Sequence, residues 1–224
     1  MNLICYPPAP LNGGRLESAP PKVGEWVWQP KVDDRRVVIH APSQTIWNQY
    51  GALSVGNKDK FKFQIALDVI TAAWKQLPYL EWFDAGLMEY RHDMMRGCII
   101  IFDLICRPLI YTRRRELLNS AFQILPSYIS KKLGDNKPIR DSVFLIPEYV
   151  EYDDVISPSG GYFDSQISSF PLNAQEYLQA ENARIGKKFY EGLVAKKTDS
   201  LYYFGVCAKE KTPDWIKHRF DNRG

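Results

Sequence analysis

The sequence is poor in the residues that build metal centres and disulfide scaffolds. Its 224 residues include four cysteines and three histidines. The cysteines lie far apart without a C-x-x-C pair, and the histidines are not spaced as metal ligands. We therefore expect neither a structural zinc site nor a disulfide framework.

Long apolar runs are also missing. No stretch approaches the roughly 20 consecutive apolar residues that a transmembrane helix needs. The N-terminus, Met1 to Pro10, lacks the charged start and apolar core of a secretory signal. We expect a soluble, intracellular protein of the cytoplasm with no membrane partner.

The charge is close to balanced. With 29 lysines and arginines against 26 acidic residues, the formal net charge is +3, which permits a nucleic-acid partner without requiring one. The hydrophobic fraction of 45% and the charged fraction of 25% are those of an ordinary globular protein. A chain of this length can bury a substantial core in one large domain.

Apolar periodicity predicts three helices and several strands. Residues 1–22 are rich in proline and glycine and indicate an irregular arm, and residues 42–57 indicate a polar loop. Apolar residues recur at intervals of three and four in the helical segments, 58–77, 111–125 and 172–190. Pro126 is expected to end the second helix before a basic linker. Strands are expected at 25–28, 37–40, 80–91, 97–105, 142–146, 191–196, 202–207 and 215–220.

Lys31 lies at the bend between the first two strands, in the segment Q-P-K-V-D-D-R-R of residues 29–36. A lysine at such a position is most often a solvated surface charge. Its interpretation therefore depends on motifs that follow along the chain.

Four segments together resemble the motifs of the covalent nucleotidyltransferases, the ATP-dependent DNA ligases, RNA ligases and mRNA capping enzymes. In order, they are K-V-D-D-R-R (31–36), I-I-I-F-D-L-I (99–105), E-G-L-V-A-K-K (191–197) and W-I-K-H-R (215–219). The resemblance spans residues 24–220 and implies an α+β nucleotidyltransferase fold, with antiparallel sheets flanked by helices around a nucleotide cleft. It implies an arm at 1–22, a nucleotidyltransferase (adenylation) domain at 23–224 and no OB-fold domain.

The resemblance also implies a chemistry. Lys31 would attack the α-phosphate of ATP to form a lysyl-AMP intermediate, for which its amine, with an ordinary pKa near 10.4, must lose a proton. Glu191 would bind Mg²⁺ bridged to the triphosphate. The ring of Phe102 would stack on adenine. The full set implied for nucleotide binding is Gln29, Pro30, Arg36, Gln49, Phe102, Lys196, Lys217 and Arg219.

Three positions depart from the family pattern. Asp34 stands where the motif has a glycine, and Gln49 stands where an arginine would help to hold the nucleotide. The family motif Asp-Gly-Glu, whose glutamate reaches the ribose, is replaced by Asp84-Ala85-Gly86. The position of that glutamate is thus occupied by Gly86.

The implied function is an ATP-dependent DNA ligase core that seals 5′-phosphate and 3′-hydroxyl ends in nicked or broken DNA. The tryptophan of W-I-K-H-R resembles the DNA ligase form of that motif. Two alternatives stay open: an RNA ligase of the same superfamily, and a ligase-derived protein that binds nucleotide or nucleic acid without catalysis. The chain is expected to be a monomer. Three alternatives stay open for the missing OB-fold: the enzyme is reduced to its catalytic core, a separate protein partner supplies the role of the OB-fold, or the sequence is a fragment. Candidate nucleic-acid contacts are Arg113, Arg114, Lys131 and Lys132.

Overall fold

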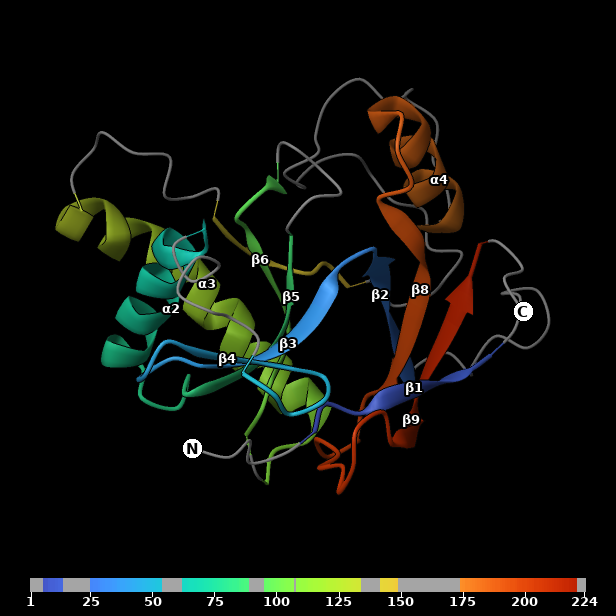
Figure 1. Ribbon diagram of the computed structural model, residues 1–224, viewed down its shortest axis with the longest axis horizontal. Coiled ribbons are helices and arrows are strands. Elements are labelled where there is room, and N and C mark those ends of the chain that lie inside the picture. The colour runs from blue at the N-terminus through green and yellow to red at the C-terminus, as the bar shows by residue number, and fades with distance from the viewer. Residues whose placement is uncertain are drawn as a thin grey trace. The chain divides into compact units, whose positions relative to one another are not determined.

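The computed structural model describes residues 6–13, 25–53, 62–88, 95–106, 108–133, 142–148 and 174–220, with the side chains of 124–133 left out. These residues form nine strands and three helices (Figure 1). The chain divides into two compact units. Unit 1 contains Met1–Ala9, Asp34–Ile146 and Leu201–Lys211, and unit 2 contains Pro10–Asp33, Pro147–Ser200 and Thr212–Gly224. The assignment of one domain to residues 23–224 stays a prediction.

Unit 1 is built on a five-stranded sheet in the order β4-β3-β5-β6-β7. Its strands are β3 (Arg35–His40), β4 (Thr45–Asn48), β5 (Trp82–Leu87), β6 (Ile99–Leu104) and β7 (Val143–Leu145). Strands β4, β3, β5 and β6 pair antiparallel, whereas β6 and β7 run parallel. The expectation of purely antiparallel sheets is therefore wrong for β7. A helix lies between β6 and β7 in the chain, which provides the crossover that a parallel pair needs.

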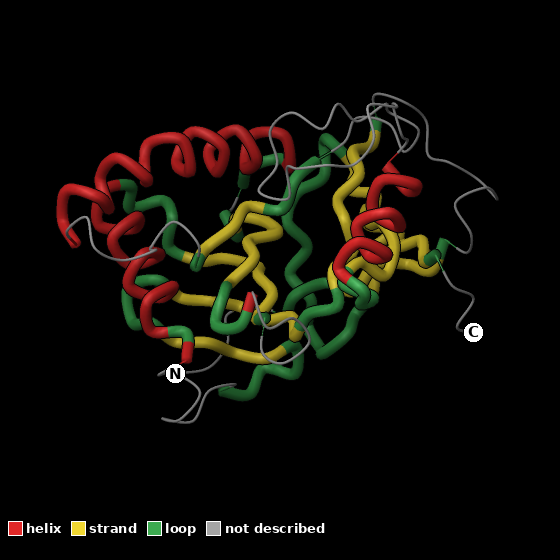
Figure 2. The backbone as a smooth tube through the Cα atoms, turned by 90° about the horizontal axis from the view of Figure 1, so that it is seen from above, coloured by secondary structure: helices red, strands yellow, loops and turns green. Residues whose placement is uncertain are grey.

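Two helices, α2 (Gln64–Gln76) and α3 (Tyr111–Leu133), pack with the apolar face of this sheet (Figure 2). Alternation along β3 sends Val37 and Ile39 into the core with Leu67 of α2 and Leu118 of α3. The other sheet face, which carries Arg36, is therefore the one that bears polar side chains. Within the described part of the chain, no helix has the length and apolar character of a membrane span.

Several predicted boundaries in unit 1 are wrong. The expected loop 42–57 contains β4. The expected strand 202–207 is not a strand: it has an isolated bridge at Gly205, and another bridge lies just before it at Leu201. Helix α3 continues through Pro126 to Leu133, because a proline removes one backbone hydrogen bond and the turns beside it persist. The linker expected after Pro126 therefore begins as helix.

Unit 2 is built on a four-stranded sheet in the order β1-β9-β8-β2. Its strands are β1 (Ala9–Asn12), β2 (Trp26–Val32), β8 (Tyr190–Lys197) and β9 (Lys211–Arg219), and β2, β8 and β9 pair antiparallel. Strand β1 lies inside the arm that was expected to be irregular.

Helix α4 (Ala174–Ile185) lies against β8. The side chain of Asn182 donates to the carbonyl of Tyr190 at 2.7 Å and accepts from its N–H at 2.8 Å. Gly186, with φ +71°, follows the helix, in the left-handed conformation that ends many helices. The helix predicted to reach Tyr190 is therefore shorter, and Tyr190 begins β8.

Candidate functional site

Lys31 lies near the end of β2, opposite Gly192 of β8. The next pair is Val32 with Tyr190, so the register shifts by one residue on β8. Glu191, which the pairing skips, is the extra residue of a β-bulge. Side chains of a regular strand alternate between faces, and the bulge is what turns Glu191 toward a lysine paired with the residue after it. The Lys31 ammonium donates a hydrogen bond to the Glu191 carboxylate within this ion pair.

Four cations share one face of the unit 2 sheet. Lys31, Gly192 and Arg219 stand opposite one another across β2, β8 and β9. In the next two cross-strand rows on the same face, Val194 stands opposite Lys217, and Lys196 stands opposite Trp215. Because opposite residues point to the same side, these side chains lie on one face with Gln29. We call this set the cationic face: Lys31, Lys196, Lys217 and Arg219.

The other face of this sheet is mostly apolar, although His218 and Lys197 also alternate to it. Trp28, Leu193 and Ala195 are each at most 2% exposed, and Pro30 alternates to the same side. The structure therefore does not bring Pro30 to the cationic face. The sheet is amphipathic, and its polar side is the one that carries Lys31.

Gly192 is the residue between Lys31 and Arg219 in their cross-strand row. A Cβ added there would stand 2.8 Å from the Cα of Arg219 and 2.9 Å from the carbonyl carbon of His218. The backbones of β8 and β9 therefore approach too closely for a side chain at 192. A glycine also leaves the row without a side chain between its two cations.

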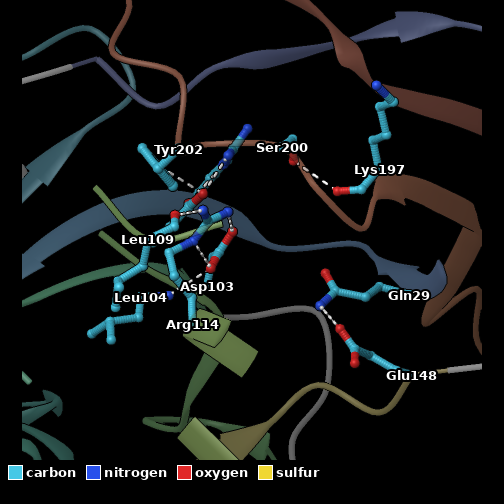
Figure 3. Close-up of polar contacts among 11 residues, drawn as sticks. Gln29, Asp103, Leu104, Leu109, Arg114, Glu148, Lys197, Ser200 and Tyr202 are labelled. Carbon is cyan, nitrogen blue, oxygen red and sulfur yellow. Dashed lines mark hydrogen bonds and ion pairs between the residues drawn. The ribbon is translucent and has the colours of Figure 1, made fainter. Parts of the chain in front are cut away.

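Two residues of this face are supported by buried contacts. Lys196 is 2% exposed, and its Nζ lies 4.2 Å from the ring centroid of Trp215, a cation–π geometry. The side-chain amide of Gln29 donates to Glu148 at 3.2 Å (Figure 3). Both contacts hold long polar side chains in fixed orientations.

Magnesium could be held here by Glu191 together with nucleotide phosphates. Mg²⁺ is usually bound through one or two carboxylates plus substrate phosphates. The described residues contain no group of three or more histidine, cysteine or acidic side chains that could form an all-protein site. Glu191 offers one carboxylate on a solvent-reached side chain, 30% exposed, which fits that shared mode.

Arg36 belongs to unit 1, on the sheet face opposite the helices. Its Nε donates to Oδ1 of Asp84 at 2.9 Å, and another nitrogen donates to the carbonyl of Pro8. Asp84 is fully buried and also accepts from the hydroxyl of Tyr202 at 3.0 Å. Burial alone would lower the pKa of Arg36, but the charge and hydrogen bonds of Asp84 raise it above its usual value. The guanidinium thus stays charged and holds Asp84.

Phe102 and Gln49 also belong to unit 1. Phe102 is half-buried on β6, although the other residues of that strand are buried. Gln49 is half-buried in the turn that follows β4. Sequence reasoning named these two residues but gave no role to Tyr202, whose bond to Asp84 joins segments far apart in the chain.

Of the arginines at the start of α3, Arg114 is not a nucleic-acid contact. Its side chain is fully buried and pairs with Asp103, at 2.9 Å from Nε and 3.0 Å from the terminal nitrogen (Figure 3). A guanidinium without exposed surface cannot reach a phosphate backbone, so that prediction is wrong. The spacing of Tyr111, Arg114 and Leu118 along one buried stripe is the signal that would have shown it.

Arg113 and Arg115, the neighbours of Arg114, have different surroundings. Arg113 is 59% exposed and pairs with Glu116 at 2.6 Å. Burial lowers the pKa of Arg115 to about 10, and this side chain donates to the carbonyl of Ile146 at 2.6 Å. The side chains of Lys131 and Lys132 lie outside the described residues. Nucleic-acid contact by Arg113 and these lysines stays a prediction.

No family model matches this chain, and no curated protein matches it. Solved structures do share its fold. The ligase domain of LigD from M. tuberculosis superposes with a TM-score of 0.57 at 14% identity, over 96% of this chain and 59% of that domain. A Lig E DNA ligase gives 0.50 at 13% identity, over 97% of this chain and 69% of the ligase.

The DNA ligase-adenylate of Chlorella virus gives a TM-score of 0.51 at 17% identity, over 97% of this chain and 68% of the viral enzyme. At such low identities the likeness establishes the fold alone. The mixed α/β architecture resembles that of these DNA ligase structures. This chain spans 59% of the length of the LigD ligase domain.

Proposed function

We propose that this chain is the core of an ATP-dependent DNA ligase that carries AMP on Lys31. The observation that supports it most strongly is the cationic face, on which Lys31 pairs with Glu191 and stands one glycine away from Arg219. The ligase-like fold agrees with this proposal.

The proposed transfer step involves Lys31, Glu191 and the bound ATP. Nζ of Lys31, after losing a proton, forms a bond to the α-phosphorus of ATP, and the bond from that phosphorus to the bridging oxygen breaks. Pyrophosphate leaves with the electron pair, the nitrogen releases its second proton to pyrophosphate or solvent, and the lysine carries AMP as a phosphoramidate. The Glu191 carboxylate, which already accepts a hydrogen bond from Nζ, is placed to receive the proton.

The remaining cations would stabilise the negative charge that develops on the phosphates during the transfer. Lys217 and Arg219 lie on the same sheet face as Lys31 and would neutralise the transferring phosphate and the pyrophosphate. The buried Nε of Arg219 has no hydrogen-bond partner among the residues that the structure describes, and a phosphate oxygen would satisfy it. A magnesium ion held by Glu191 and the phosphates would add Lewis-acid stabilisation.

In a ligase the carried AMP passes to a 5′-phosphate end, and a 3′-hydroxyl displaces it to seal the strand. We infer nicked or broken DNA as the substrate, because the proteins that share this fold are DNA ligases.

Nick sealing tests the function. Wild-type protein with ATP and Mg²⁺ should join a nicked DNA duplex that bears a 5′-phosphate, and Lys31→Ala should not. Lys75→Ala, which removes an exposed lysine on α2, is the matched control and should seal normally. Sealing of nicked RNA in place of DNA would favour an RNA ligase, and ATP binding without sealing of either would favour a non-catalytic binding protein.

A further inference from the structure

Two positions that depart from the ligase motifs meet in unit 1. Asp34 stands just before β3, and Gly86 lies on β5 opposite Arg36 of β3. A Cβ added at Gly86 would stand 2.8 Å from Cγ of Asp34 and 2.8 Å from Cζ of Phe102. The carboxylate of Asp34 therefore fills the space that a side chain at position 86 would need, beside the edge of the Phe102 ring.

The surroundings give this carboxylate a distinct chemical character. Arg36 donates two hydrogen bonds to Asp84, and the Tyr202 hydroxyl donates another to the same carboxylate. The negative charge of Asp34 also acts on Arg36. A carboxylate accepts hydrogen bonds and repels phosphate. The adjoining half-buried aromatic ring offers a surface for stacking a planar base.

We propose that Asp34 supplies, from the turn before β3, the carboxylate that a glutamate at position 86 would supply from β5. This carboxylate accepts a hydrogen bond from the nucleoside of a nucleotide whose base stacks on Phe102. The donor is a ribose hydroxyl or an exocyclic amino group of the base. The assignment rests on the proposed function, because ATP is the nucleotide that this function requires.

The exchange of the two side chains gives a test that needs no nucleotide. Gly86→Glu alone should lower the thermal unfolding midpoint by several degrees, because the new side chain must displace Asp34 and sets two carboxylates side by side. Asp34→Gly combined with Gly86→Glu should recover the part of that loss that Asp34 causes, while the close contact with Phe102 remains. Lys75→Glu, at an exposed position of α2, is the control. Its change in the unfolding midpoint should simply add to that of Asp34→Gly. If Gly86→Glu lowers the unfolding midpoint equally with and without Asp34→Gly, the proposed exchange of the two side chains is wrong.

Nucleotide binding tests the contact itself. Asp34→Asn keeps the shape and removes the charge, and it should weaken equilibrium binding of ATP by about tenfold, the loss expected for a hydrogen bond to a charged group. If a ribose hydroxyl is the donor, 2′,3′-dideoxy-ATP should bind wild type and Asp34→Asn alike. If the amino group is the donor, inosine triphosphate should do so.

The outcomes separate this inference from the function that it rests on. ATP binding and Lys31 labelling that Asp34→Asn leaves unchanged would overturn the nucleoside contact alone. Equal weakening of ATP and both analogues would also overturn it, because a general loss of binding is what a structural defect produces. Wild-type protein that binds no ATP would overturn the proposed function and the contact together, while the exchange of side chains is judged by the unfolding data.

Discussion

Among single residues, Glu191 has the most direct influence on Lys31. Its carboxylate accepts a hydrogen bond from the ammonium, and both side chains keep some exposure, 21% for Lys31 and 30% for Glu191. A partly exposed ion pair of this kind contributes little to folding. Its importance is chemical, because the amine must pass its proton to an acceptor before it attacks phosphorus.

We predict that Glu191→Gln slows AMP transfer to Lys31 by about 100-fold or more, since a positioned acid or base typically contributes that much. The thermal unfolding midpoint should not change. Asp199→Asn, which removes a 68% exposed carboxylate in the same unit, is the control and should react normally. A wild-type transfer rate in Glu191→Gln, measured by rapid quench, would show that neither a metal nor a proton depends on this residue.

Arg114 has the opposite character, because its ion pair with Asp103 is buried and structural. Removing one partner leaves the other charge buried without compensation, so Arg114→Ala should lower the free energy of unfolding by about 3 to 5 kcal/mol. Urea denaturation measures this. Arg113→Ala should change it by less than about 0.5 kcal/mol, because that side chain is 59% exposed. Equal effects of the two substitutions would contradict the buried ion pair.

At the scale of elements, the close approach of β8 and β9 sets the geometry of the cationic face. Gly192→Ala would force its Cβ against the Arg219 backbone, and we expect a loss of about 1 to 3 kcal/mol in unfolding free energy. Gly205→Ala is the milder comparison, because its Cβ would be 3.3 Å from the nearest atom and needs a shift of only a few tenths of an ångström. If both variants unfold at the wild-type urea concentration, the strands can separate without cost and the row around Gly192 is not fixed.

The helices of unit 1 show what periodicity can and cannot predict. Apolar spacing located α2, yet Ile65, an apolar residue that follows this spacing, is 54% exposed. Spacing gives the period of a helix but not which turn meets the sheet. Arg114 shows the converse, because its charge hid a buried position in the stripe of α3.

The cationic face was predictable as a set of residues but not as a face. The motif resemblance named Lys31, Lys196, Lys217 and Arg219 individually. Their common orientation depends on pairing between β2, β8 and β9, which are distant in sequence, and on a bulge that places Glu191. Registers and bulges follow from tertiary packing, which a single sequence does not specify.

At the scale of the whole molecule, the two units differ in the charge of their candidate surfaces. Unit 2 gathers four cations on one sheet face, which suits phosphate. Unit 1 sets the carboxylate of Asp34 beside Phe102, which suits a nucleoside.

The cationic face supplies positive charge for DNA phosphates, so phosphate contacts should dominate DNA binding. We predict that log affinity for nicked DNA falls with log salt by roughly 0.9 for each phosphate neutralised. Lys131→Ala or Lys132→Ala should weaken all DNA sequences about equally and reduce that slope by about one contact. Affinity that stays flat between low and moderate salt, or a preference for matched single-stranded RNA, would contradict the DNA ligase proposal.

Covalent capture of AMP tests the central claim most directly. Protein incubated with α-labelled ATP and Mg²⁺ should gain one acid-labile, base-stable AMP, which peptide mass spectrometry should locate on Lys31. Chelation of the metal should abolish the label, Lys31→Ala should carry none, and Lys75→Ala should carry as much as wild type. Label that persists in Lys31→Ala, or wild-type protein that never acquires it, would contradict the account.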